Sequence, residues 1–524
     1  MPLSTLAGRA LLLVLATAAP LAAQSHRLGT IAFPNSGPRT AQAPFIRGVL
    51  LLHSFEYDDA AAAFREAQHL APGFALAYWG EAMTRTHPVW NEQDVDSARS
   101  VLARLAPRPE ARIARARTPR ERGYLEAVEI LYGEGSKPRR DTLYSAAMGR
   151  LAAAYPSDLE ARAFYALSLL GLSQGTRNVP TYMRAGALAE EVLRRNPDHP
   201  GAAHYVIHAF DDPAHAPLGL PAARAYSKIA PGASHAQHMT SHIFVALGMW
   251  DETVDANIAA LGPNRPAWTP NHVSAWLDYA YLQQGRTAEA RRLLESVRGN
   301  LGTPPRRYAR LYVLMMRAHY LVASERWADS SIAWAVDTAG TGPVSQAMDA
   351  FALGYAALRR GDRAAADAEL RRLGALAARP PAADDDDDNP QVVTILDTEL
   401  RAALRAADGK SDEAVALLRQ AASVEDTMAV AFGPPDVVKP THELLGEFLL
   451  AQGKAAEAQQ EFVRALALAP RRTASLLGLA RAATSAGDAP VAEQARADLR
   501  AIWHQADEGL PGRAEVPKPS AQAR

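Results

Sequence analysis

The sequence predicts an all-α fold in which helical hairpins repeat and stack into a solenoid, a superhelix. Three observations lead to this prediction. First, residues 439 to 470, KPTHELLGEFLLAQGKAAEAQQEFVRALALAP, have the layout of a helix–turn–helix unit of about 34 residues. Second, this layout recurs along the chain. Third, almost no stretch alternates apolar and polar residues with a period of two, so strands are not expected.

The copy at residues 439 to 470 shows what each recurring position does. Gly446, Ala458 and Ala465 are small, so two helices can approach each other closely. Phe462 fills the gap that they leave, and Pro470 stops the second helix.

Other copies carry the same kinds of residue at the same offsets. RGVLLLHSFEYDDAAAAFREAQHLAP has Gly48, Ala60, Phe64, Ala67 and Pro72. HVSAWLDYAYLQQGRTAEARRLL has Leu277, Tyr281, Gly285 and Ala290. The pattern resembles the tetratricopeptide (TPR) repeat family over most of residues 41 to 505. The resemblance implies a TPR-type helical-hairpin solenoid.

The first 24 residues, MPLSTLAGRALLLVLATAAPLAAQ, have the layout of an export signal. Arg9 precedes an apolar run from residue 10 to 21, and the small residues Ala22 and Ala23 follow it. This predicts a signal peptide over residues 1–23 and a periplasmic or secreted protein. An uncleaved anchor is the alternative, but the apolar run is short for a bilayer. The chain has no cysteine, which excludes disulfides and thiolate ligands.

Composition shifts predict the remaining boundaries. Five aspartates, Asp384 to Asp388, repel one another between prolines, which predicts an exposed acidic linker. A calcium-binding loop is the alternative, but its central glycine and its final glutamate are missing there. The predicted segments are an N-terminal arm (24–40), a solenoid (41–377), the linker (378–393), a C-terminal repeat block (394–505) and a disordered tail (506–524).

Charge limits the classes of partner. The hydrophobic fraction of 48% and the charged fraction of 22% are typical of a globular protein. A net charge of -1 supplies no field that would recruit nucleic acid, so none is expected as a partner. No segment after the signal peptide is apolar and long enough to cross a membrane, and the sequence leaves the oligomeric state open.

Residues 199 to 244 hold seven of the fifteen histidines of the chain. Aligning Gly248 with Gly453 places these histidines in repeat register. His235, His238 and His242 then occupy positions two, five and nine of one repeat. His204 and His208 occupy positions five and nine of the repeat before, and His272 occupies position two of the repeat after.

Spacings of three and four residues put side chains on one stripe of a helix. Neighbouring first helices pack about 8–10 Å apart. We therefore expect the imidazoles of residues 204, 208, 235, 238 and 242 to crowd one patch of the inner surface. The TPR resemblance implies that positions two, five and nine line a concave, ligand-binding groove.

Two functions follow from such a patch. The first is capture of a protein or peptide partner in the groove, with contacts from His204, His208, His235, His238, His242 and His272. The second is a metal-binding site or a metal-dependent enzyme, because His-x-x-x-His on one helix suits a divalent transition ion. Its expected ligands are His204, His208, His235, His238 and His242. Asp211 and Asp212, a turn beyond His208, are expected either as further ligands or as partners that fix a histidine tautomer.

Imidazole ligands do not separate zinc, copper, nickel and iron. No HExxH motif is present, so no catalytic residue is assigned and the sequence leaves enzymatic activity open. His53 is predicted to be a hydrogen-bonded histidine at a helix end, and His215 to face water.

A narrower resemblance spans nearly the whole chain. HYVIHAFDD, SHAQHMTSHIF, AYWGEAM and FGPPDVVKPTHELLGEFLL resemble a group of exported bacterial TPR proteins with HYxIHA, HxxHMPxHI and PxHELLG elements. The chain departs from that pattern at Thr240, where a proline is usual, and at Phe210–Asp211, where an acidic residue often follows HA directly. The resemblance implies the fold and adds no mechanism.

Overall fold

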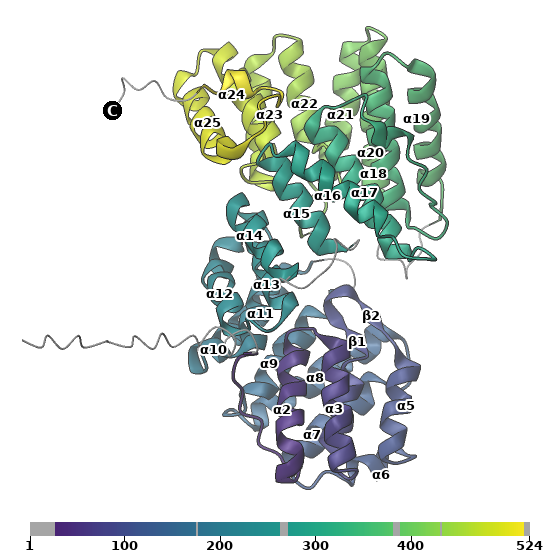
Figure 1. Ribbon diagram of the computed structural model, residues 1–524, viewed down its shortest axis with the longest axis vertical. Helices are drawn as coiled ribbons and strands as arrows, with labels where there is room; N and C mark the ends of the chain where they lie inside the picture. Colours follow the sequence, from purple (N-terminus) through teal and green to yellow (C-terminus); the bar gives the residue numbers. More distant parts are fainter. Residues whose placement is uncertain (1–26, 174–176, 262–270, 381–387, 430–431, 518–524) are drawn as a thin grey trace, which may run out of the picture.

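The computed structural model describes residues 27–173, 177–261, 271–380, 388–429 and 432–517. Within these ranges the chain is built of α-helices, as predicted (Figure 1). The strands found in the described ranges are the two-residue β1 (Thr86–His87) and β2 (Glu92–Gln93), which pair antiparallel. No helix there is long and apolar enough to cross a membrane. The predicted signal peptide and Asp384 to Asp387 lie outside the described ranges.

The helices follow one another as antiparallel hairpins. In the first half they are α2 (Arg39–His53), α3 (Tyr57–Leu70), α4 (Ala75–Met83), α5 (Val95–Leu105), α6 (Pro109–Ile113), α7 (Pro119–Leu131), α8 (Lys137–Ala154), α9 (Leu159–Leu170), α10 (Val179–Arg195), α11 (Pro200–Ala209), α12 (Ala216–Ile229), α13 (Ser234–Ala246) and α14 (Trp250–Leu261).

In the second half they are α15 (His272–Gln283), α16 (Thr287–Gly299), α17 (Arg307–Ser324), α18 (Pro343–Arg359), α19 (Arg363–Ala377), α20 (Pro390–Ala407), α21 (Ser411–Glu425), α22 (Thr441–Ala451), α23 (Ala455–Leu468), α24 (Thr473–Ala486) and α25 (Ala489–Ile502). Short 3-10 turns, η1 (Pro88–Trp90), η2 (Ser330–Ala333), η3 (Trp503–Gln505) and η4 (Arg513–Glu515), connect or follow them. Figure 1 shows α2–α9 at one end of the long axis and α15–α25 at the other.

At both ends of the chain, a phenylalanine ring packs against glycines of the neighbouring helices and holds the hairpins together. A Cβ on Gly80 would lie 2.3 Å from the ring of Phe64, and one on Gly478 would lie 2.2 Å from the ring of Phe462. Gly48 and Gly446 face the same two rings from the preceding helices. Each ring thus fills the gap that small residues leave, as the repeat pattern predicted.

The apolar core divides inside α13 and not at the predicted linker. One cluster of buried residues runs from Phe33 to Phe244 and the other from Val245 to Val516. The second cluster includes α18, α19 and α20, which contact one another across residues 378–393. These helices bury their apolar faces on each other, so the second core cluster includes helices from both sides of the predicted linker.

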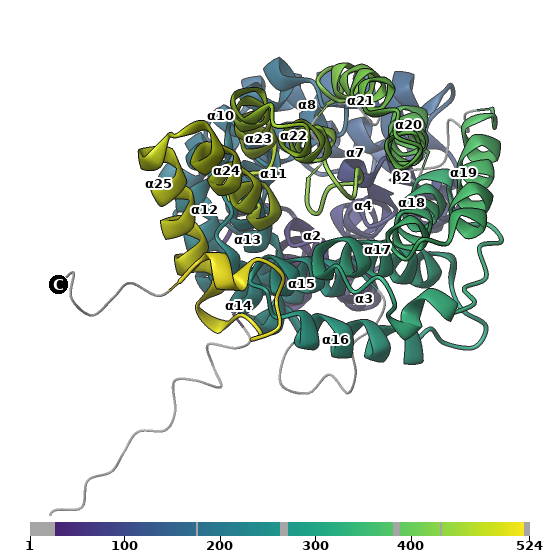
Figure 2. The same cartoon turned by 90° about the horizontal axis from the view of Figure 1, so that it is seen from above.

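The C-terminal helices fold back on the middle of the chain. Trp250 Nε1 donates a hydrogen bond to the carbonyl oxygen of Arg471 (3.1 Å), and the amide of Thr473 donates to Gln283 Oε1 (3.0 Å). Trp503 Nε1 donates to the carbonyl oxygen of Gln283 (3.1 Å). Seen from above, α15–α25 therefore follow a ring that returns to α14 (Figure 2).

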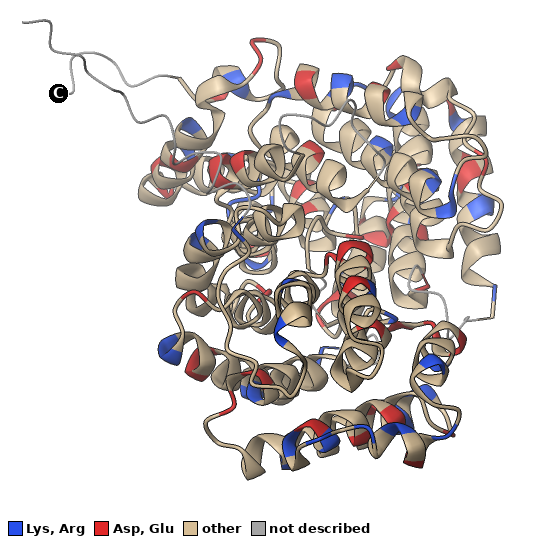
Figure 3. Cartoon of the chain, turned by 60° about the horizontal axis from the view of Figure 1, so that its bottom comes forward, with Lys and Arg blue, Asp and Glu red and all other residues tan. Residues whose placement is uncertain are grey.

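The predicted disordered tail is wrong for residues 506–517. Leu510 and Val516 are only 8% and 1% exposed, and both belong to the second core cluster. Two apolar side chains in this short segment suffice to hold it against the ring, and Arg481 pairs with Glu515 at 2.6 Å. Charged residues of both signs lie along the helices, in keeping with the net charge of -1 (Figure 3).

Candidate metal centre

The first helices of three consecutive hairpins carry six histidines to one place, which we call the histidine centre. His204 and His208 lie on α11, His235, His238 and His242 on α13, and His272 on α15. Their ring centroids are separated by 4.8 Å (204–208), 5.1 Å (204–235), 5.9 Å (208–242), 6.1 Å (235–238), 5.0 Å (238–242) and 4.4 Å (238–272). The spacing argument correctly predicted that these side chains converge.

Four histidines of the centre are buried, whereas His235 and His272 are half-buried. His204 and His238 are 0% exposed, and His242 is 3% exposed. Aromatic rings cover them: Phe55 lies over His204 (centroids 4.3 Å apart), and Phe432 lies over His242 (5.3 Å). The sequence did not predict these covers, because they come from segments distant in the chain.

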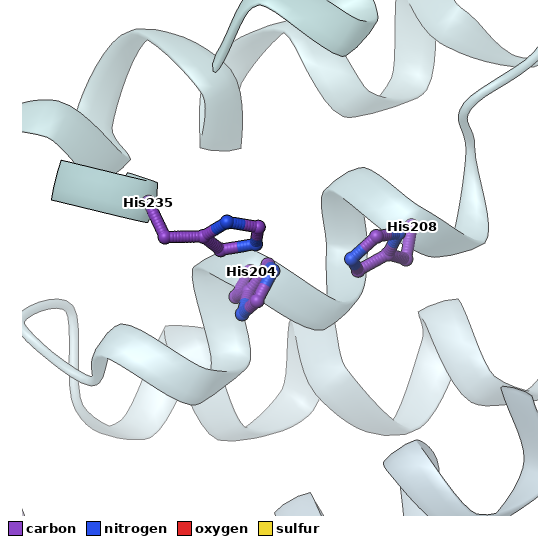
Figure 4. A group of neighbouring side chains, drawn as sticks. All are labelled: His204, His208 and His235. Atoms are coloured by element: carbon purple, nitrogen blue, oxygen red, sulfur yellow. The ribbon is translucent and has the colours of Figure 1, made fainter. Parts of the chain in front are cut away.

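His204, His208 and His235 form the first group in the centre. Figure 4 shows His204 and His208 on α11 and His235 reaching toward them from the first turn of α13. One ring nitrogen from each lies within 4.8 Å of the other two. The Nε2 atom of each is buried and has no hydrogen-bond partner among the described residues. A buried polar atom without a partner is costly, so these three nitrogens call for an explanation.

The backbone of α2 sets the tautomer of His204. His204 Nδ1 lies 2.7 Å from the carbonyl oxygen of His53, and a carbonyl only accepts, so Nδ1 carries the proton. His53 is the last residue of α2, where carbonyls have no partner within the helix. Nε2 of His204 therefore presents a lone pair to the group. Such outer hydrogen bonds orient histidines that bind metals.

His238 and His242 form a second group with equally defined tautomers. His238 Nδ1 donates to Asn257 Oδ1 (2.6 Å), and Asn257 Nδ2 in turn donates to the carbonyl oxygen of Thr253 (2.8 Å). His242 Nδ1 donates to Asp211 Oδ2 (2.6 Å). The two Nε2 atoms face each other at 3.1 Å.

The two aspartates of the predicted site have different roles. Asp211 accepts a hydrogen bond from His242 Nδ1, the geometry of one of the two roles expected for these aspartates. Asp212 instead pairs with Arg177 (2.8 Å) and accepts a hydrogen bond from His215 Nδ1 (2.8 Å). Asp212 turns away because its carboxylate also accepts the backbone amides of the turn after α11. His215 thus lies against a carboxylate, with 27% of its side chain exposed.

Burial keeps five of the six imidazoles neutral. Desolvation is the largest influence on His204 and His272 and lowers the pKa of each to about 3. Desolvation, with the neighbouring histidines, also lowers the pKa values of His208, His235 and His238. A neutral imidazole keeps one lone pair, which is the form that binds a metal ion.

A third group, His53, Glu160 and His199, lies nearby and is fully hydrogen-bonded. His53 Nε2 donates to Glu160 Oε2 (2.7 Å) and His199 Nε2 to Glu160 Oε1 (3.1 Å). His53 Nδ1 accepts from the hydroxyl of Tyr205 (2.8 Å), and His199 Nδ1 accepts from the amide of Ala202 (3.1 Å). Every ring nitrogen has a partner, so this group stabilises the fold. His53 is the hydrogen-bonded helix-end histidine that the sequence predicted.

A cavity of about 150 Å³ adjoins the His242 side of the centre. Asp211, Val245, Trp250, Tyr279, Phe432 and Pro470 are among its lining residues. The first and last of these lie far apart in the chain, and the C-terminal helices close the cavity by folding back. The cavity therefore offers space for a small molecule beside Asp211, the hydrogen-bond partner of His242.

Replacing Gly433 by alanine is expected to lift residues 432–438 from the centre. Gly433 has φ +94°, and a Cβ there would lie 2.0 Å from Trp276 Cζ2, so alanine meets both backbone strain and a clash. We expect a loss of roughly 1–3 kcal/mol of stability and faster amide exchange in this loop and in α15, measured by hydrogen–deuterium exchange.

Gly453→Ala is the matched control for that substitution. Gly453 has φ +75° and nothing within 4 Å of an added Cβ, so it incurs the strain alone. Equal effects of the two substitutions on amide exchange in α15 would contradict the prediction that residues 432–438 cover the centre.

Comparisons with known proteins show only distant likenesses. No family model matches the chain, and no curated protein matches it. A solved structure of the human IFIT1 dimer with m7Gppp-AAAA is 14% identical, with 91% of this chain and 92% of that chain covered and a TM-score of 0.36. The APC/C hetero-tetramer Cut9–Hcn1 is 13% identical, with 86% and 78% covered and a TM-score of 0.35. At such TM-scores neither likeness tells what this chain binds.

Proposed function

We propose that this helical-repeat chain is a metal-binding protein whose first group, His204, His208 and His235, coordinates a divalent transition ion. The observation that carries the proposal is the set of three buried Nε2 atoms without partners, whose rings lie within reach of one ion. A cation held by one nitrogen from each ring would give these buried side chains a partner. Zinc and similar ions bind imidazole nitrogens at about 2.0–2.1 Å, and three protein ligands leave a fourth position for water or a substrate.

Burial favours this function over capture of a partner by the same histidines. A peptide lying on the repeat surface does not touch His204 or His238, which are 0% exposed. Phe55 would also have to leave His204 before a partner could reach its ring. The helical scaffold suits binding in general, but the geometry of these side chains suits an ion.

The ligand set narrows the class of ion. Calcium and magnesium prefer oxygen ligands, and the first group offers none. Imidazole suits zinc, copper, nickel and iron, and divalent copper binds nitrogen sites most tightly in the general order of affinities. We therefore propose zinc or copper as the ions to test first.

Removing one ligand of the first group is expected to remove one bound ion. The chain would be stripped with a chelator, exposed to excess Zn(II), desalted and analysed for metal per chain. His235→Ala should bind one ion fewer than the wild type, and His208→Ala should do the same. Zinc should also raise the free energy of unfolding of the wild type by about 2.7 kcal/mol at a free-ion concentration of 100 Kd, and its melting temperature should rise accordingly.

His69→Ala is the matched control, because His69 is exposed on α3 and far from the predicted ligands in the sequence. It should bind as much zinc as the wild type. Circular dichroism checks that each variant keeps its helices, and the half-buried His235 is the safer of the two positions. A wild type without zinc, or two ligand variants with undiminished zinc, would show the proposal to be wrong.

A further inference from the structure

We propose that His238 and His242 hold a second transition ion beside the first, so that the histidine centre is dinuclear. This inference extends the proposed function, yet it rests on a separate set of contacts. The first group is defined by three nitrogens without partners, whereas the second is defined by two nitrogens that face each other.

Both rings of the second group point a lone pair at the same spot. A carboxylate accepts only, so the proton between His242 and Asp211 belongs to His242 Nδ1. Asn257 uses its amide nitrogen to bind the carbonyl oxygen of Thr253, so its oxygen faces His238 and takes the Nδ1 proton there. An imidazole with a single proton then carries it at Nδ1 in both rings, so the two Nε2 atoms face each other as acceptors.

The distance between these atoms suits two ligands of one ion. The Nε2 atoms lie 3.1 Å apart. With bonds of about 2.0–2.1 Å, two nitrogens at this distance subtend roughly 95–102° at the ion, between octahedral and tetrahedral values. The two Nδ1 partners are of the kind that orients metal-bound histidines, a carboxylate and a carbonyl-type oxygen.

A third imidazole stands beside this pair. The ring centroid of His272 lies 4.4 Å from that of His238, and the Nε2 atom of His272 is buried without a partner among the described residues. His208 of the first group lies 5.9 Å from His242 between centroids. The two groups are therefore adjacent, and the cavity beside Asp211 and Phe432 adjoins the second.

A proton shared between His238 and His242 is the alternative to a second ion. The added proton would turn one of the two Nε2 atoms into a donor. Its positive charge would pair with the carboxylate of Asp211. It requires no metal, so metal content separates the two interpretations.

The test compares metal content and spectra of four full-length proteins loaded with Cu(II). The wild type should hold two ions per chain, and His242→Ala and His208→Ala should each hold one. Asp211→Asn keeps an oxygen acceptor near His242 but removes the charge, so it should weaken the second ion by about 10–100-fold and leave the first unchanged. Adjacent Cu(II) ions broaden each other's electron paramagnetic resonance signals, so the wild-type signal should be broadened and that of His242→Ala should not.

The outcomes separate this inference from the proposed function. One ion in the wild type that His208→Ala loses and His242→Ala retains would overturn the second site alone. One ion that either substitution removes would mean a single ion shared by both groups, which also overturns it. No bound copper in any protein would overturn both. Asp211→Asn gives the same answer through affinity if His242→Ala fails to fold.

Discussion

Replacing Glu443 by alanine is expected to lower the free energy of unfolding by about 3–5 kcal/mol, the usual effect of leaving a buried charge unpaired. Glu443 is 0% exposed and Arg472 is 2% exposed. Arg472 Nε donates to Glu443 Oε2 (2.8 Å) and Arg472 Nη2 to Oε1 (3.1 Å). The hydroxyl of Ser475 also donates to Oε2 (2.6 Å). Alanine would leave the guanidinium charge buried without a counter-ion.

The loss of stability should extend from α22 to α15, because Arg472 also hydrogen-bonds a side chain of α15. Arg472 Nη1 donates to the hydroxyl of Tyr279 at 3.0 Å. Tyr279 lines the cavity beside the histidine centre, so loss of this contact should loosen the place where the C-terminal helices return. Hydrogen–deuterium exchange in α15 would report the loosening.

Urea denaturation of Glu443→Ala measures the change in stability, with Glu457→Ala as the control. Glu457 pairs with Arg419 on the surface, where the two side chains are 50% and 57% exposed. Removing an exposed pair costs about 0–1 kcal/mol. If the two variants lost equal stability, the buried network would not hold the C-terminal helices.

Replacing Glu160 by alanine should have an effect of similar size, about 3–5 kcal/mol, at the other end of the chain. Glu160 accepts hydrogen bonds from His53 and His199, and all three residues are 0% exposed. Alanine would leave two buried N–H groups without acceptors. It would also free His53, whose carbonyl oxygen sets the tautomer of His204, so zinc affinity should fall as well.

The pH dependence of stability distinguishes the charge of Glu160 from its shape. Burial opposes ionisation, but His199 and His53 outweigh it and lower the pKa of Glu160 to about 2. A carboxyl whose pKa is lowered by folding stabilises the native state above its unfolded pKa, about 4.3. This contribution is lost as the pH falls from about 4.3 toward 2. Glu160→Gln lacks it and should lose less stability over this window than the wild type.

Urea midpoints near pH 5 and pH 3 measure this difference, and Glu66→Gln is the control. Glu66 pairs with Arg47 on the surface, where the side chains are 52% and 51% exposed, so its variant should follow the wild type. An equal loss of stability in Glu160→Gln and the wild type would exclude an ionised Glu160 in this network.

The helices and the faces that they present were predictable from the sequence. The offset from Gly248 to Gly453 placed His235, His238 and His242 on one stripe of α13, and the structure has them there. Both glycines end their helices with positive φ, which is why they mark the register. Helix geometry repeats every 3.6 residues, so local spacing suffices to assign a face.

The covering and orienting residues could not be predicted in the same way. Phe55 and Phe432 lie over the centre from two segments that no repeat position relates to α11 or α13. Asn257 lies on the second helix of its hairpin, where an asparagine has no special meaning in the repeat. Burial of His204, His208, His238 and His242 therefore depends on tertiary contacts, and it is the reason why an ion is proposed rather than a partner.

By itself, the sequence determined an all-α repeat and the stripe of histidines on its inner helices. Tertiary structure alone decided that most of the stripe is buried, that the C-terminal helices return to α14 and α15, and which nitrogen of His204 keeps a lone pair. The reason is physical. A helical face depends on residues three or four apart, whereas the proton of His204 is placed by a carbonyl oxygen 151 residues away.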